Sequence, residues 1–181
     1  MSAPETGGRL PASVILLLSA LAFYATPGAT FAAEVVRYDF QGASSVCQPA
    51  TYSYAKGLDS RPLSFVNKGN STVFVSCALR SDPRASGRGA MKVLVEAGAT
   101  GQRSGRVSCT LVEGHERGEV VYKTKSANVY SGQRGVAITW QPVEIAEDAP
   151  EHIFRPAVQC QLAPGTAIHY LAVTYDEDIG N

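Results

Sequence analysis

The sequence predicts an all-β protein: an antiparallel β-sandwich of about nine strands, jelly-roll or immunoglobulin-like, held by two disulfides. Short runs rich in Val, Tyr, Thr and Phe alternate with turn-forming residues along most of the chain. No segment shows the apolar repeat of an amphipathic helix. Four cysteines follow an N-terminal leader, and that combination is typical of disulfide-bonded exported proteins.

The leader comprises residues 1–32 of the 181-residue chain. It has a polar start with one Arg, an apolar run over residues 12–25, and small residues up to Ala32. This order is typical of a secretory signal peptide, with cleavage expected after Ala32 because Thr30 and Ala32 then occupy the positions that need small residues. The apolar run is shorter than the ~20 residues of a transmembrane helix. We therefore expect a secreted or periplasmic protein whose mature chain has no membrane span and forms one domain, residues 33–181.

The charges of the chain balance. The sequence contains 16 Lys and Arg against 16 Asp and Glu, and the leader removes one of each sign, Arg9 and Glu5. Nucleic acids attract clustered excess Lys or Arg, which the mature chain lacks, so we do not expect a nucleic-acid partner.

The cysteines are Cys47, Cys77, Cys109 and Cys160. None lies two to four residues from another, the spacing typical of zinc ligands, so we expect no metal site and two disulfides. Of the three possible pairings, Cys47–Cys77 with Cys109–Cys160 is favoured. Cys109 and Cys160 lie in the middle of strands, and Cys47 lies just before the hairpin that carries Cys77.

Alternation within the runs separates an inner from an outer face, because successive side chains of a strand point to opposite sides. Three cysteines share the setting Val-x-Cys-x-Leu, with Ser108, Thr110, Gln159 and Gln161 on the opposite face of two of these strands. Trp140 alternates with Val136 and Ile138 and is predicted to be in the core. Strands are expected at 34–40, 62–66, 72–79, 90–96, 106–112, 119–125, 135–141, 157–162 and 167–175.

Four apolar residues fall on nominally outer faces, where a solvated sheet is usually polar. They are Phe74, Leu94, Val112 and Val121. Two interpretations remain open: the segment 34–60 covers them, which is favoured, or they form a contact surface for a partner.

No catalytic residue is predicted. His115, His152 and His169 belong to no recognisable catalytic or metal-binding motif, and no cofactor motif is present, so we expect neither metal nor cofactor. The acidic run 176–178 is interpreted as solvated. Tyr52 and Tyr54 are candidates for a sugar-stacking surface, although their alternation does not fix which way they point.

Several short motifs resemble those of a group of uncharacterised exported bacterial proteins with four cysteines. They are Val-Cys-Gln-Pro at 46–49, Val-Ser-Cys at 75–77 and 107–109, and the segments 162–165 and 173–181. The resemblance implies export and a disulfide-bonded fold, and it implies no activity.

The sequence therefore indicates a non-catalytic binding or envelope-associated module, with a protein or a glycan as a possible ligand. The alternatives are a small hydrolase or a carbohydrate-binding unit, and after these an inhibitor of a partner enzyme.

Overall fold

A computed structural model describes residues 34–80, 89–114, 119–145 and 152–178. The predicted signal peptide and His115 lie outside these residues. The described elements are β1 (Glu34–Gly42), α1 (Ala43–Val46), β2 (Cys47–Pro49), η1 (Tyr52–Gly57), β3 (Leu58–Arg61), β4 (Ser64–Asn67), β5 (Val73–Ala78), β6 (Lys92–Ala99), β7 (Gly105–Gly114), β8 (Val120–Val129), β9 (Val136–Trp140), η2 (Pro142–Glu144), β10 (Ala157–Leu162) and β11 (Thr166–Asp178).

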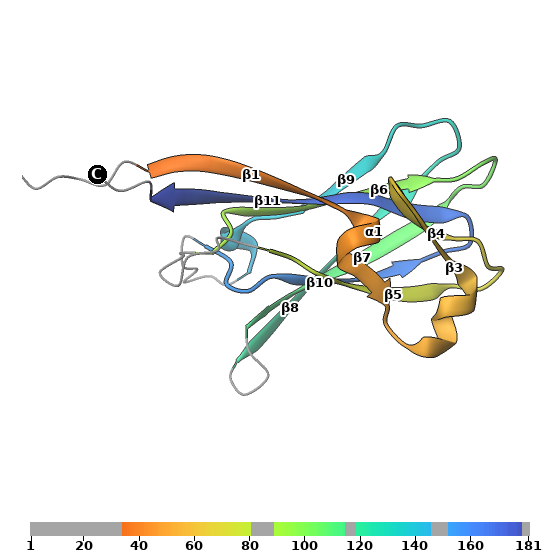
Figure 1. The fold of residues 1–181 in the computed structure, drawn as a ribbon, viewed down its shortest axis with the longest axis horizontal. Helices are drawn as coiled ribbons and strands as arrows, with labels where there is room; N and C mark the ends of the chain where they lie inside the picture. The colour runs from red at the N-terminus through yellow and green to blue at the C-terminus, as the bar shows by residue number, and fades with distance from the viewer. Residues whose placement is uncertain (1–33, 81–88, 115–118, 146–151, 179–181) are drawn as a thin grey trace, which may run out of the picture.

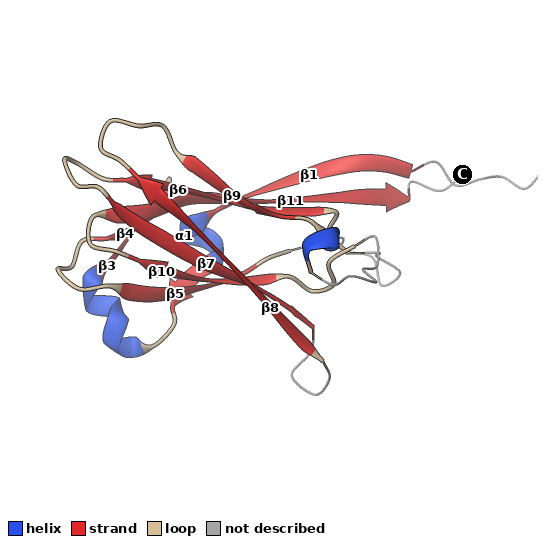
Figure 2. Ribbon diagram, turned by 180° about the vertical axis from the view of Figure 1, so that it is seen from behind, coloured by secondary structure: helices blue, strands red, loops and turns tan. Residues whose placement is uncertain are grey.

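These strands form two antiparallel sheets that face each other (Figures 1 and 2). Sheet A has the order β3-β4-β11-β6-β9, with β1 also paired to β11, and sheet B has the order β2-β5-β10-β7-β8. The predicted β-sandwich is confirmed. The short strands β2 and β3 had not been predicted, and β2 matters because it carries Cys47 into sheet B.

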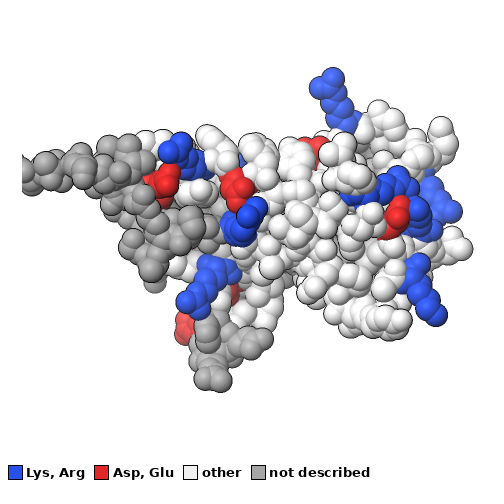
Figure 3. All heavy atoms as spheres, in the orientation of Figure 1, with Lys and Arg blue, Asp and Glu red and all other residues white. Residues whose placement is uncertain are grey.

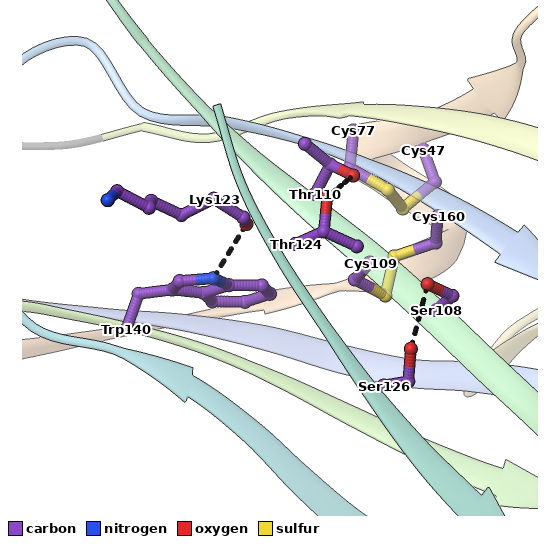
Figure 4. Close-up of a disulfide and its surroundings, with 10 residues drawn as sticks. All are labelled: Cys47, Cys77, Ser108, Cys109, Thr110, Lys123, Thr124, Ser126, Trp140 and Cys160. Atoms are coloured by element: carbon purple, nitrogen blue, oxygen red, sulfur yellow. Dashed lines mark hydrogen bonds between the residues drawn. A yellow bond between two sulfur atoms is a disulfide. The ribbon is translucent and has the colours of Figure 1, made fainter. Parts of the chain in front are cut away.

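The core fills the space between the sheets. Val93, Val95 and Ala97 of sheet A point inward, and Val107, Cys109 and Leu111 of sheet B do the same. The alternation seen in the sequence therefore gives the correct inner face of these strands. Trp140 is fully buried, as predicted, and its Nε1 donates a hydrogen bond of 2.9 Å to the backbone oxygen of Lys123 in the opposite sheet (Figure 4).

Both disulfides have the favoured pairing, Cys47–Cys77 and Cys109–Cys160. Each joins residues that lie directly opposite one another on neighbouring strands of sheet B, β2 with β5 and β7 with β10. The disulfides therefore strengthen one sheet from its core side and do not link the two sheets. No helix in the described ranges has the length and apolar character needed to cross a membrane.

Candidate functional site

The outer face of sheet B is a nearly uncharged surface of amide, hydroxyl and small side chains, which we call the polar face. It consists of the outward residues of five strands: Gln48, Phe74, Ser76, Ala78, Arg106, Ser108, Thr110, Val112, Val120, Tyr122, Thr124, Ser126, Asn128, Ala157, Gln159 and Gln161. Arg106, near one end, is its single charged member. The outward Ser and Gln residues of β7 and β10 were visible in the sequence, but only the strand order brings them next to one another.

A row of polar residues crosses the middle of the face. Gln48, Ser76, Gln159, Thr110 and Thr124 lie opposite one another in turn on β2, β5, β10, β7 and β8. The first four are each the chain neighbour of a disulfide cysteine, and neighbours on a strand point to opposite faces. Each disulfide therefore lies directly behind a pair of these polar residues and fixes the spacing of the strands that carry them.

The hydrogen bonding of the face differs from strand to strand. The hydroxyls of Thr110 and Thr124 lie 2.8 Å apart, and Ser126 donates to Ser108 at 2.9 Å, so β7 and β8 are joined by two side-chain pairs (Figure 4). Within the described ranges, no protein group hydrogen-bonds the side-chain amides of Gln48, Gln159 and Gln161. Because each amide can both donate and accept, these three present unused hydrogen-bonding capacity to a ligand.

The polar face is hollowed. One depression of about 600 Å³ lies over the first four residues of the central row, from Gln48 to Thr110, and extends to Val112, Ala157 and Tyr122. A second, of about 360 Å³, lies further along β7 and β10, lined by Ser108 and Gln161 together with Thr72, Arg106 and Ala163. The two depressions share the same face of the sheet, and Ala163 follows Ala157 by six residues, a span of about 20 Å for an extended strand.

Aromatic side chains lie at both sides of the face. Tyr122 on β8 lines the larger depression and is 64% exposed. At the opposite side, Tyr54 of η1 packs against Phe74, with the ring centroids 5.5 Å apart. Tyr52, also in η1, is 90% exposed. Tyr122 is therefore the aromatic ring best placed to contact a molecule in the depression.

The neutrality of the face depends on an inward orientation of lysines on β8. Lys123 lies opposite buried Leu111, so Lys123 and, two residues on, Lys125 point to the core side of this edge strand. The Nζ of Lys125 donates at 2.6 Å both to the backbone oxygen of Thr139 and to the carboxylate of Glu144. These hydrogen bonds attach the edge of sheet B to sheet A, and the inward orientation of Lys123 and Lys125 keeps both cations off the polar face.

The four predicted contact residues do not form one surface. Phe74 and Val112 lie on the polar face, whereas Leu94 lies on the outer face of sheet A, opposite Ala172. Val121 packs against the core, so its expected outward orientation is wrong. All four are half-buried. The segment 34–60 covers Phe74 through Tyr54, in agreement with the favoured interpretation for that residue.

The remaining polar candidates lie away from this face. His152 Nε2 is 3.0 Å from Asp176 Oδ1, and the two side chains are 8% and 12% exposed, so the pair fixes the segment before β10 against β11. His169 lies beside Gly98 of β6 in sheet A. Within the described ranges, no three His, Cys, Asp or Glu residues are grouped so as to hold a metal ion. On the side of the molecule shown in Figure 3, basic and acidic side chains are interspersed.

No protein-family model and no curated protein matches this chain. Solved structures that resemble it include the C-terminal CBM6 of LamC, a marine laminarinase from Zobellia galactanivorans, with a TM-score of 0.43 and 12% identity over 76% of this chain and 99% of that one. A cellulose-specific carbohydrate-binding module, CBM28, has a TM-score of 0.40 and 14% identity over 74% and 86% of the two chains. The family 11 module from Clostridium thermocellum has a TM-score of 0.39 and 9% identity over 78% and 86%. All three TM-scores are below 0.5, so these likenesses do not assign a function.

Proposed function

We propose that the chain is an exported binding module whose polar face binds a neutral oligosaccharide or polysaccharide. The observation that carries the proposal is the row of uncharged amide and hydroxyl groups across a hollowed sheet, with exposed Tyr122 at its side. Sugars present many hydroxyls that both donate and accept hydrogen bonds, and glutamine amides match both roles. A tyrosine ring adds apolar contact to the faces of sugar rings while its hydroxyl stays hydrated.

The lack of charge argues for a neutral ligand. The central row contains no ionisable side chain, and Arg106 lies in the smaller depression at one end. Anionic glycans are held by groups of Arg or Lys, because charge-assisted hydrogen bonds are the strongest available to a carboxylate or sulfate. A face with a single Arg at its end favours ligands whose recognition does not depend on charge.

The chemistry of the face supports binding without cleavage. Glycoside hydrolysis needs two carboxyl groups placed on either side of the scissile bond. The outward residues of sheet B in the described ranges include no Asp or Glu. The two disulfides behind the central row support a rigid, preorganised surface, which reduces the entropic cost of binding. They also support export, because disulfides persist in oxidising compartments.

A panel of immobilised neutral and anionic polysaccharides tests the proposal with the disulfide-bonded protein. We expect retention on at least one neutral polysaccharide, with little change in affinity as the salt concentration rises, and no release of reducing sugar. Binding only to anionic glycans, or binding that disappears in moderate salt, contradicts the proposal, and so does failure to bind any glycan.

A further inference from the structure

Strand β1 leaves one edge of sheet A open. Residues Glu34–Gly42 pair with β11 on one side, and no other described strand pairs with β1. Beyond Thr174, where β6 begins, the end of β11 pairs with β1 alone among the described strands, and the two run out together past the rest of the sheet (Figure 1). A long open edge presents unpaired backbone N–H and C=O groups and is a template for pairing with another strand.

The other edges of the two sheets are short or protected. β2, β3 and β9 have three, four and five residues. β8 is longer, but it carries two inward lysines, a feature that discourages edge pairing, and Lys125 bonds to the backbone of β9. β1 has nine residues and no lysine. It is therefore the edge best suited to association.

Alternate residues of β1 expose apolar side chains. Val36, Tyr38 and Phe40 are 49%, 67% and 66% exposed and lie on one face of the strand. Phe40 contacts Tyr170 of the same chain edge to face, with centroids 5.7 Å apart, and still leaves most of its surface open. This row lies on the outer face of sheet A, opposite to the polar face.

We propose that β1 pairs antiparallel with β1 of a second copy of this chain, centred on Tyr38. In that register Arg37 lies opposite Asp39 of the second copy, and the two-fold symmetry repeats the pair. Val36 then lies opposite Phe40 of the second copy on the other face of the strands. Opposite charges and apolar pairs directly across an antiparallel ladder both stabilise it.

The charges on β1 select a second copy as the occupant of this edge. Arg37 forms a 2.8 Å ion pair with Glu177 of β11, and its side chain remains 50% exposed. Asp39 is 32% exposed, lies 4.0 Å from Arg80 and accepts a hydrogen bond from Gln41. Pairing between copies extends both groups into a network of alternating charges, which requires a partner strand with the same Arg-x-Asp order.

The dimer joins two copies of sheet A edge to edge. Both polar faces belong to sheet B, so neither is covered by the strand pairing. The association does not depend on the proposed glycan binding, and where both hold, the dimer presents two binding faces to one polymer.

Sedimentation velocity of the disulfide-bonded protein over a range of concentrations tests the pairing. The charge-reversal variants Arg37→Asp and Asp39→Arg each place like charges opposite one another in the dimer. We expect the wild-type protein to dimerise and each variant to remain monomeric. An equal mixture of the two variants is expected to regain the dimer, because the two carboxylates of one variant then lie opposite the two guanidinium groups of the other. Arg61→Asp is the matched control, since Arg61 follows Asp59 at the same spacing on edge strand β3.

Three results overturn the proposal: a wild-type protein that is monomeric at every concentration, single variants that still dimerise, or a mixture that stays monomeric. Thermal unfolding of each variant is measured first, to show that the variant is folded before its oligomeric state is determined. Arg61→Asp is expected to dimerise as the wild type does, and loss of the dimer in this control also counts against pairing through β1.

Discussion

Gln159 and Thr110 lie directly opposite each other on β10 and β7, and their chain neighbours Cys160 and Cys109 form a disulfide on the reverse side of the same sheet. Cys47 and Cys77 stand in the same relation to Gln48 and Ser76. Four of the five residues in the central row are therefore positioned by covalent bonds behind them. The polar face combines a nearly uncharged chemistry with two strand pairs, β2–β5 and β7–β10, that are each held together by a disulfide.

Removing the Cys109–Cys160 disulfide by substituting both residues with Ala is expected to lower the free energy of unfolding by about 4 kcal/mol, because the bond closes a long loop in the unfolded chain. Removing Cys47–Cys77, which closes a shorter loop, is expected to lower it by about 3.5 kcal/mol. Urea unfolding measures both. A loss below about 1 kcal/mol for either pair contradicts a stabilising role for that disulfide.

Replacing Gly89, even by alanine, is predicted to destabilise the fold. Its φ is +100°, and a Cβ placed there meets the backbone oxygen of Ile153 at 2.5 Å, beside the two hydrogen bonds that join Ala90 to Ile153. Gly89→Ala is expected to cost at least about 2 kcal/mol, because the backbone oxygen cannot move away as a side chain can.

Gly132→Ala is the matched control for this glycine. Gly132 also has a positive φ, +74°, but a Cβ there has open space around it. Its substitution is expected to cost about 1 kcal/mol from backbone strain alone. Equal melting temperatures for the two variants contradict the contact with Ile153.

The Lys125–Glu144 pair predicts a small dependence of stability on pH. The hydrogen bond from the Lys125 ammonium, followed by one from the Gln141 backbone, lowers the pKa of Glu144 below its ordinary value of 4.5. A lowered pKa in the folded protein means that the stabilisation is present above the ordinary value and is lost as the pH falls through the lowered one. Because the carboxylate is 40% exposed, we expect no more than about 1 kcal/mol.

Melting temperatures of Glu144→Gln and the wild type at about pH 7 and about pH 3 check this dependence. The variant is expected to melt lower at neutral pH, and the difference is expected to shrink in acid, because the stabilisation is lost as the pH falls toward the lowered pKa of Glu144 in the folded state. Glu119→Gln, at an exposed glutamate just before β8, is the control. A difference that grows in acid contradicts the sign of the effect.

Alternation predicted the buried strands well, because one apolar face of a strand determines the orientation of all its residues. The Val-x-Cys-x-Leu segments show this: Cys77, Cys109 and Cys160 are all buried. On β8 the same reasoning failed for Val121, because this edge strand points its lysines inward and its Tyr, Thr and Ser residues outward. Inward-pointing charged residues discourage an edge strand from pairing with another chain, and on β8 this arrangement replaces the usual pattern of charged residues outside and apolar residues inside.

The polar face was only partly predictable. Ser108, Thr110, Gln159 and Gln161 were recognised as outward residues of their own strands. Their assembly into one surface requires the order β2-β5-β10-β7-β8, which pairs segments far apart in the sequence. Local alternation carries no information on which strands are neighbours, so neither the central row nor the position of Tyr122 beside it follows from the sequence.

Calorimetric titration with a neutral oligosaccharide, chosen from the polysaccharide that the protein retains, tests the central proposal most directly. The variants are Tyr122→Ala on the polar face and Tyr130→Ala, an exposed tyrosine beyond the end of β8 that is 55% exposed against 64% for Tyr122. We expect about tenfold weaker binding for Tyr122→Ala, or about 1.4 kcal/mol, and unchanged binding for Tyr130→Ala. Equal affinities for both variants and the wild type, or equal losses in both, contradict binding at the polar face.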